Sequence, residues 1–272
     1  FKQKTAYEIM PSLVGSEMCI RDRYFLPIKK FGERPYSKIL GFPKSTQRSI
    51  NARLSELTKL GVTAVAFTGP IEIEGLNVVG KGYVGIVVLI KIKSNVFALK
   101  IRRTDSPRKK MDDEAKLLQI ANKTNVGPQL IRSSKNFIIM EFIKGEKIIN
   151  WVNNSSKINP KRLRFVIKKV LTDCFLLDQA GLDHGELSVL DKHVLVTNRS
   201  AKIIDFESSS SKRKTSNVTS ATQAILIGTA LAKTVRKKIQ VPRRDKIIRL
   251  VRNYKKLRTI ESFDNLLVGL KL

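Results

Sequence analysis

The sequence predicts an α+β fold in two lobes, with an antiparallel sheet in the N-terminal lobe and a reduced set of helices in the C-terminal lobe. Runs rich in β-branched and aromatic residues indicate the strands, at 71–79, 84–92, 96–101 and 137–143. Amphipathic stretches indicate the main helices, at 160–180 and 243–258. With 272 residues, 42% of them hydrophobic, the chain can bury one two-lobed core or two small domains.

We divide the chain into four parts. Residues 12–23 resemble a translated sequencing adapter, so we expect residues 1–23, and Cys19 with them, to be an artefact; a short natural extension is the alternative. The rest divides into a helical segment, a sheet lobe and a helical lobe, at residues 24–68, 69–142 and 143–272.

Within the helical segment, residues 36–42 and 45–60 predict two short helices around a turn. The apolar stripe of the second helix is all that a brace packed on the sheet lobe requires. A helix-turn-helix that contacts DNA is the alternative, because Lys44, Arg48 and Arg53 suit phosphate groups.

A glycine-rich turn joins the first two strands. The eight residues from Gly80 to Val87 carry Gly80, Gly82 and Gly85 at the spacing of loops that cover nucleotide phosphates. The triplet alone fits bulges or a tight hairpin equally well. A dinucleotide fingerprint requires a helix directly after its glycines, whereas residues 84–90 are too rich in β-branched residues for a helix. The order strand, loop, strand therefore favours a phosphate cover.

Lys100 lies in the third strand among apolar neighbours, where an unpaired ammonium is costly and a phosphate or carboxylate partner is expected. Ser106 and Pro107 predict the start of a helix over 108–122. Glu114 falls on the packed side of that helix and can pair with Lys100. An exposed strand edge for the lysine and a solvated position for the glutamate are the alternatives.

Carboxylates gather after the helix at 160–180, and the five are Asp183, Glu186, Asp191, Asp205 and Glu207. Such a concentration is unusual in a chain with a net charge of +29, and converging carboxylates are what a magnesium triphosphate site requires. Solvated turn acids are the alternative, and the simpler one for Asp183. We interpret His184 and His193 as structural, because neither has a second histidine or cysteine at ligand spacing.

With these residues in this order, the chain resembles atypical protein kinases of the lineage that includes the RIO kinases, and archaeal predicted serine/threonine kinases in particular. The resemblance runs from about Ile71 to at least Phe206. It implies a two-lobed kinase fold, ATP and Mg²⁺ as cofactors, and phosphotransferase activity on a protein substrate. The nucleotide-binding residues that it implies are Gly80, Gly82, Gly85, Val87, Lys100, Glu114, Met140, Glu141 and Ile143, with Met140 beside the adenine.

The resemblance also implies the catalytic roles. Asp205 would hold the principal metal, Asp191 would take the second metal position, and Glu186 would be the base or position a water. Protein kinases have aspartate at the position of Glu186, asparagine at that of Asp191 and glycine at that of Glu207. The longer glutamate can misplace a base by about an ångström, which can cost ~100-fold in rate. An ATP-binding pseudokinase or an ATPase scaffold is therefore the alternative, and the loop between Asp191 and His193 can be aligned in more than one way.

The charge of +29 indicates a polyanionic partner, because self-repulsion of that size is easier to tolerate beside one. Basic residues are densest over 236–258, where the helix at 243–258 has a basic outer face. We expect this face to contact RNA or an RNA–protein particle, with a solvated surface as the alternative. Sparse aromatic residues argue against a base-stacking platform.

The remaining signals concern location. The longest apolar stretches are far shorter than a membrane span, and no signal-peptide pattern opens the chain. Cys19 and Cys174 alone make no disulfide framework. We therefore expect a cytoplasmic protein without a membrane partner.

Overall fold

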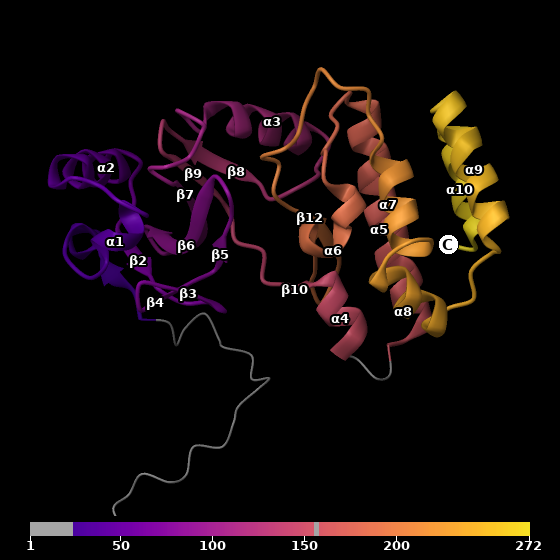
Figure 1. The fold of residues 1–272 in the computed structure, drawn as a ribbon, viewed down its shortest axis with the longest axis horizontal. Helices are drawn as coiled ribbons and strands as arrows, with labels where there is room; N and C mark the ends of the chain where they lie inside the picture. The colour runs from indigo at the N-terminus through magenta and orange to yellow at the C-terminus, as the bar shows by residue number, and fades with distance from the viewer. Residues whose placement is uncertain (1–23, 155–157) are drawn as a thin grey trace, which may run out of the picture.

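A computed structural model describes residues 24–154 and 158–272 of the chain. Its N-terminal part is built on an antiparallel sheet and its C-terminal part mainly from helices, and the chain crosses between the two after strand β9 (Figure 1). The predicted α+β fold class is confirmed, and the arrangement is compatible with a two-lobed kinase-like fold. The adapter-like segment and Cys19 lie outside the described residues.

The main sheet has the strand order β1-β2-β6-β7-β9-β8, and β5 pairs with β6. Its strands are β1 Leu26–Pro27, β2 Ala64–Ala66, β5 Gly80–Lys81, β6 Gly85–Ile92, β7 Asn95–Arg102, β8 Leu130–Ser133 and β9 Phe137–Glu141. The register places Lys100 opposite Val87 on one side and opposite Ile138 on the other. Because alternate residues share a face, Lys100, Ala98 and Met140 lie on the same side of the sheet.

The strand predicted over 71–79 is in fact two strands, β3 Ile71–Ile73 and β4 Leu76–Val78, which pair with each other as a separate hairpin. Glu74 and Gly75 turn the chain with φ values of 52° and 76°. Two consecutive residues with positive φ are typical of tight hairpin turns, and glycine favours them. The strand that pairs with β6 at the glycine-rich turn is the two-residue β5.

Residues 24–68, predicted to be helical, also supply the first two strands of the sheet. The helices are η2 Ile28–Gly32, α1 Ser37–Leu40 and α2 Gln47–Lys59. Arg53 on α2 is 3% exposed and donates to the carbonyl oxygens of Leu40, at 2.7 Å, and Arg102, at 2.8 Å. Its guanidinium is therefore part of a brace on the sheet lobe. The helix-turn-helix alternative required this group to be available to phosphate, and it is not.

Helix α3, Asp112–Lys123, packs beside β8 and starts four residues later than predicted. The Ser106 hydroxyl accepts from the Arg108 amide and forms only a turn. The Arg108 guanidinium contacts the carbonyl oxygen of Glu207, far along the chain. This long-range contact cannot be read from local sequence, and the segment that makes it lies outside the helix.

The C-terminal lobe surrounds α5, Pro160–Gln179, which matches the predicted helix closely. Its other helices are α4 Ile148–Asn154, η3 Leu187–Val189, α6 Leu190–His193, α7 Asn217–Leu226, α8 Ala230–Lys238, α9 Arg244–Leu257 and α10 Ile260–Leu270. A small antiparallel sheet is formed by β10 Glu146–Lys147, β11 Val194–Val196 and β12 Ala201–Ile203. Among the helices described here, none is both long enough and apolar enough to span a bilayer.

Candidate active site

Lys100 is held in the centre of the sheet, on β7 between β6 and β9, and is 5% exposed. Gly85 on β6 makes room for its side chain, since a Cβ there would lie 3.1 Å from Lys100 Cγ and 2.8 Å from the Ile101 carbonyl oxygen. Only glycine fits such a close approach. The glycine is thus required mainly by the close approach of the Ile101 carbonyl oxygen, and it also leaves space for the lysine stem.

Three carboxylates surround the Lys100 ammonium. Its Nζ lies 2.7 Å from Glu114 Oε1, 3.0 Å from Asp205 Oδ1 and 2.8 Å from Glu207 Oε2. The sheet, helix α3 and the segment after β12 therefore meet at one cation. The predicted pairing of Lys100 with Glu114 is present, but Glu207 is an additional partner that the sequence did not indicate. An ammonium has three N–H groups, so these carboxylates use its whole donor capacity.

Burial and neighbouring charges shift the pKa values of this cluster in opposite directions. Burial alone would lower the pKa of Lys100, but Glu114, Asp205 and Glu207 together raise it above its usual value. Burial raises the pKa of Glu114, and Lys100 opposes that shift. For Asp205 the attraction of Lys100 exceeds the effect of burial, so its pKa is lowered. At neutral pH, Lys100 is therefore a cation and Asp205 an anion.

Asp205 follows β12 with a left-handed backbone conformation, φ 69°. Non-glycine residues rarely adopt this conformation, and where they do it is often at functional sites. His184 steadies the preceding residue by donating from Nε2 to the Ile204 carbonyl oxygen at 3.1 Å, and its ring packs edge-on against Phe206. Burial lowers the pKa of His184 to about 4, so the ring is neutral near pH 7.

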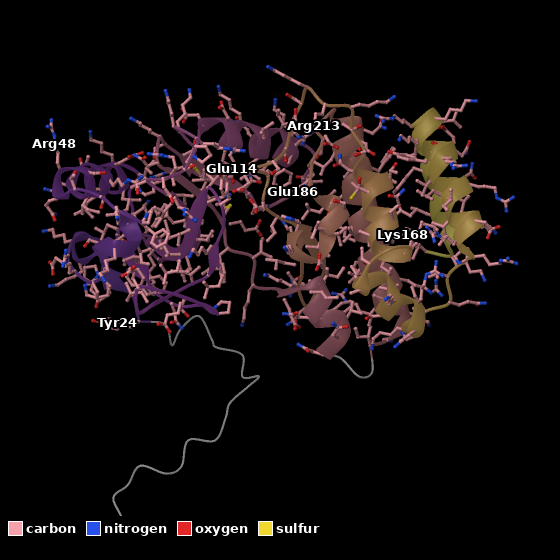
Figure 2. All side chains as sticks on the ribbon, viewed as in Figure 1. Tyr24, Arg48, Glu114, Lys168, Glu186 and Arg213 are labelled. Atoms are coloured by element: carbon pink, nitrogen blue, oxygen red, sulfur yellow. The ribbon has the colours of Figure 1, made fainter. Side chains whose placement is uncertain are left out.

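Glu186 lies across the lobe boundary from Glu114 (Figure 2). Its Oε2 is 3.4 Å from His193 Nε2. Glu186, His193 and Asp205 each offer a ligand atom, and these atoms lie within 4.8 Å of one another. A second such group is made by Glu114, Asp205 and Glu207.

Asp191 belongs to neither group of ligand atoms found among the described residues; it lies on the short helix α6. His193, interpreted from sequence as structural, is the residue that the fold brings to Glu186 and Asp205. The sequence carried one signal for this outcome. His193 directly precedes the strand β11, and the spacing from Asp191 to His193 left more than one alignment of this loop open.

Asn217, at the start of α7, holds the backbone of the loop that carries Glu186. Its Oδ1 accepts from the His184 amide at 2.8 Å, and its Nδ2 donates to the Leu182 carbonyl oxygen at 2.7 Å. Asp183 contributes to the same support, because its carboxylate accepts from Arg213 Nε at 3.0 Å and from the Ser216 amide at 3.1 Å. Asp183 is thus a structural turn acid, while sequence analysis did not single out Asn217.

The glycine-rich turn lies close to this cluster. Gly80 pairs with Val87, and the Gly82 amide donates to the Gly85 carbonyl oxygen at 2.8 Å. A Cβ on Gly82 would lie 3.9 Å from Glu207 Oε2. The turn and the carboxylate of Glu207 therefore border the same small region above Lys100.

The segment between the lobes starts at the end of β9. Met140 pairs with Ala98 on the sheet face that carries Lys100. The amide of Glu141 donates to the Gln129 carbonyl oxygen at 2.8 Å, and its side chain accepts from Lys202 at 3.2 Å. Ile143 follows in the connection between the lobes. That Met140, Glu141 and Ile143 contact adenine stays a prediction.

Comparisons with known proteins find two kinds of relative. No protein-family model matches it. It is 36% identical to the Uncharacterized protein MJ1211 of Methanocaldococcus jannaschii over 121 residues, which are 43% of this chain and the whole of that protein. It is 26% identical to the protein kinase C eta type of Mus musculus over 184 residues, 63% of the chain.

A third relative is the protein kinase C epsilon type of Oryctolagus cuniculus, 28% identical over 146 residues, half of the chain. The matches span only 26% and 20% of the two protein kinase C sequences. They establish a distant, kinase-like similarity. The match to the archaeal protein is 36% identical and covers its whole length, which shows a shared family. The chain belongs to the family of MJ1211.

Proposed function

We propose that this chain is an ATP- and divalent-metal-dependent phosphotransferase of the atypical serine/threonine protein kinase type. The observation that carries the proposal is the meeting of Lys100 from the sheet lobe with Asp205 from the helical lobe, at 3.0 Å. A cation and a metal-binding carboxylate at one lobe boundary are what a metal–triphosphate complex requires. The distant similarity to protein kinase C supports the same class of reaction.

The residues at this boundary fit a divalent cation by their donor chemistry, since Asp205 and Glu186 offer carboxylate oxygens. Such an ion, when bound, would neutralise charge on the phosphates. Lys100 would hold phosphate oxygens, Glu114 would orient Lys100, and the turn from Gly80 to Val87 would cover the phosphates.

Glu186 would hold the acceptor hydroxyl, or a water, and accept its proton. Its side chain is 38% exposed, so an acceptor can reach it from solvent. A protein serine or threonine is the acceptor that we propose. If water is the acceptor instead, the same residues make an ATPase, and if Glu186 is misplaced they make a scaffold that binds ATP without turnover.

The test is transfer of labelled γ-phosphate from ATP, with metal, to protein or to water in the presence of a ribosome-rich extract. We expect Lys100→Ala and Asp205→Ala to lose at least about 100-fold in rate, because each removes charge stabilisation of the transferred group. Lys123→Ala and Asp264→Ala remove the same charges from exposed positions and should keep full activity. Undiminished turnover in both site variants would reject the site.

We also propose that the basic face of α9 contacts RNA, on or near an RNA–protein particle. Ile247, Val251 and Tyr254 are buried, so the opposite face of the helix points outward. The side chains of Arg243 and Arg249 are 93% and 75% exposed. The helix lies at the end of the molecule away from the sheet lobe (Figure 1), which leaves the lobe boundary clear.

Binding of a labelled RNA, measured against salt concentration, tests this surface. Replacing Arg249, Arg252 and Lys256 together by alanine should weaken binding and reduce the slope of log affinity against log salt by about 2 to 3, since each phosphate contact contributes about 0.7 to 0.9. Alanine at the exposed residues Lys29, Arg48 and Lys123 is the matched control. Equal slopes for the two triple variants would show that α9 is not the contact surface.

A further inference from the structure

Two groups of side chains at the lobe boundary have the ligand atoms to bind a cation, and they differ in how many of their members contact Lys100. In the group of Glu114, Asp205 and Glu207, every residue already contacts the Lys100 ammonium, at 2.7–3.0 Å. That charge takes the place of a metal ion. In the group of Glu186, His193 and Asp205, only Asp205 contacts Lys100. The second group is therefore the one whose charge a metal ion can balance.

His193 is unusual within that group. The residue is 8% exposed, and its Nδ1 is buried with no hydrogen-bond partner among the described residues. Its Nε2 is 3.4 Å from Glu186 Oε2, longer than most hydrogen bonds to nitrogen. The His193 ring thus offers a nitrogen within 4.8 Å of carboxylate oxygens of Glu186 and Asp205. Two carboxylates and an imidazole nitrogen at this spacing suit a cation as their shared partner.

We propose that Glu186, His193 and Asp205 form a mixed nitrogen-and-oxygen site that binds a first-row divalent transition metal ion, such as Mn²⁺, in preference to Mg²⁺. The proposal rests on the proposed function, because the same ion would meet the phosphates of ATP. Mg²⁺ is hard, prefers oxygen ligands and keeps several waters, whereas imidazole nitrogen suits Fe²⁺, Ni²⁺ and Zn²⁺. Mn²⁺ also binds oxygen well, but it accepts an imidazole nitrogen more readily than Mg²⁺ does. Replacing an all-oxygen ligand set by one that includes imidazole therefore shifts selectivity away from Mg²⁺.

Glu186 keeps a role in transfer under this proposal. A carboxylate has two oxygens, and one can contact the metal while the other holds the acceptor hydroxyl. Asp191, by contrast, is not expected to contact the ion. The metal ligand from this loop is thus either His193 or Asp191. The two assignments predict opposite results for whether a nitrogen atom is bound to the ion.

The measurement is pulsed electron paramagnetic resonance of Mn²⁺ bound to the full, untagged chain with a methylene-bridged ATP analogue, which has no nitrogen in its phosphate chain. The chain has two histidines, so a coupled imidazole nitrogen has few sources. We expect a directly bound nitrogen in the native protein, and its replacement by a nitrogen-15 signal when histidine is labelled. This result needs no variant and does not depend on turnover.

His193→Asn should retain bound Mn²⁺ but lose the nitrogen signal, and its ratio of Mn²⁺ to Mg²⁺ affinity should fall at least about tenfold. Asp191→Asn and the exposed Asp264→Asn should change neither quantity. Bound Mn²⁺ without a nitrogen signal in the native protein, or loss of Mn²⁺ in Asp191→Asn alone, would overturn the proposal.

The outcomes separate this inference from the proposed function. Nucleotide binding with Mn²⁺ and no nitrogen signal leaves the phosphotransferase proposal intact and rejects the site. A nitrogen signal from Mn²⁺ without any binding of the ATP analogue supports the metal site and rejects the nucleotide function.

Discussion

Glu207 changes what Lys100 can do. The lysine already donates to three carboxylates, so a phosphate oxygen must displace one of them. Glu114 is as buried as Lys100, and Asp205 is the proposed metal ligand. Glu207, whose Oε2 lies beside the glycine-rich turn, is therefore the group that must give way.

We predict that Glu207→Gln strengthens binding of ATP with metal by up to about tenfold, equivalent to about 1.4 kcal/mol. The change removes a negative charge that repels phosphate and competes for Lys100, while it keeps the size of the side chain. Titration calorimetry measures the affinity, and the exposed Glu261→Gln is the control. Weaker binding in Glu207→Gln would show that Glu207 helps to hold the nucleotide complex.

Sequence patterns predicted a site residue where a buried charge requires a partner of opposite charge. A lysine in an apolar strand required a carboxylate, and Glu114 is at that position. His193 and Glu207 could not be found in this way, because their neighbours are set by loop geometry and not by periodicity. The unusual left-handed conformation of Asp205 is likewise invisible in its sequence context.

At the scale of elements, the brace formed by α2 depends on one buried cation. Arg53 joins α2 to the Leu40 carbonyl oxygen at the end of α1 and to the Arg102 carbonyl oxygen at the end of β7. Glu56, one turn later, accepts from the Asn136 amide at 2.9 Å. The helix is thereby tied to the strands that position Lys100.

We predict that Arg53→Met lowers the free energy of unfolding by about 2 to 4 kcal/mol, because it removes charge-assisted hydrogen bonds and leaves buried carbonyl oxygens unsatisfied. Urea denaturation measures this loss. Arg48→Met, on the exposed face of the same helix, should change stability by less than about 0.5 kcal/mol. Equal stabilities of the two variants would contradict the role given to Arg53.

Long, periodic elements were predictable and short ones were not. Helix α5 buries one face over 20 residues, so its pattern is unambiguous. Strands β1 and β2 have only two and three residues, too few to show an alternation, and their place in the sheet comes from pairing with distant partners. The split of 71–79 into two strands depends on a turn at Glu74 and Gly75, and Gly75 is the one local signal for it within an otherwise strand-like run.

At the scale of the whole molecule, one buried cluster lies within the sheet lobe, and the other extends from the helical lobe to α3 and β9, so the two lobes share packing around the candidate site. Lys100 and Asp205 are 105 residues apart in sequence and 3.0 Å apart in space. The sequence predicted the fold class from its strands and helices, but the closeness of these two residues depends on how the lobes pack. The proposed function depends on that closeness.

The most direct test is therefore equilibrium binding of ATP with Mn²⁺ to the full chain, measured by titration calorimetry. We predict a dissociation constant between about 1 µM and 1 mM for the native protein, by analogy with the common range of KM for enzyme substrates. Lys100→Met and Asp205→Asn should each weaken binding at least about tenfold, while Lys123→Met and Asp264→Asn should leave it unchanged. An absence of ATP binding, or equal binding by all four variants, would contradict the claim that the two lobes hold one metal–nucleotide complex between Lys100 and Asp205.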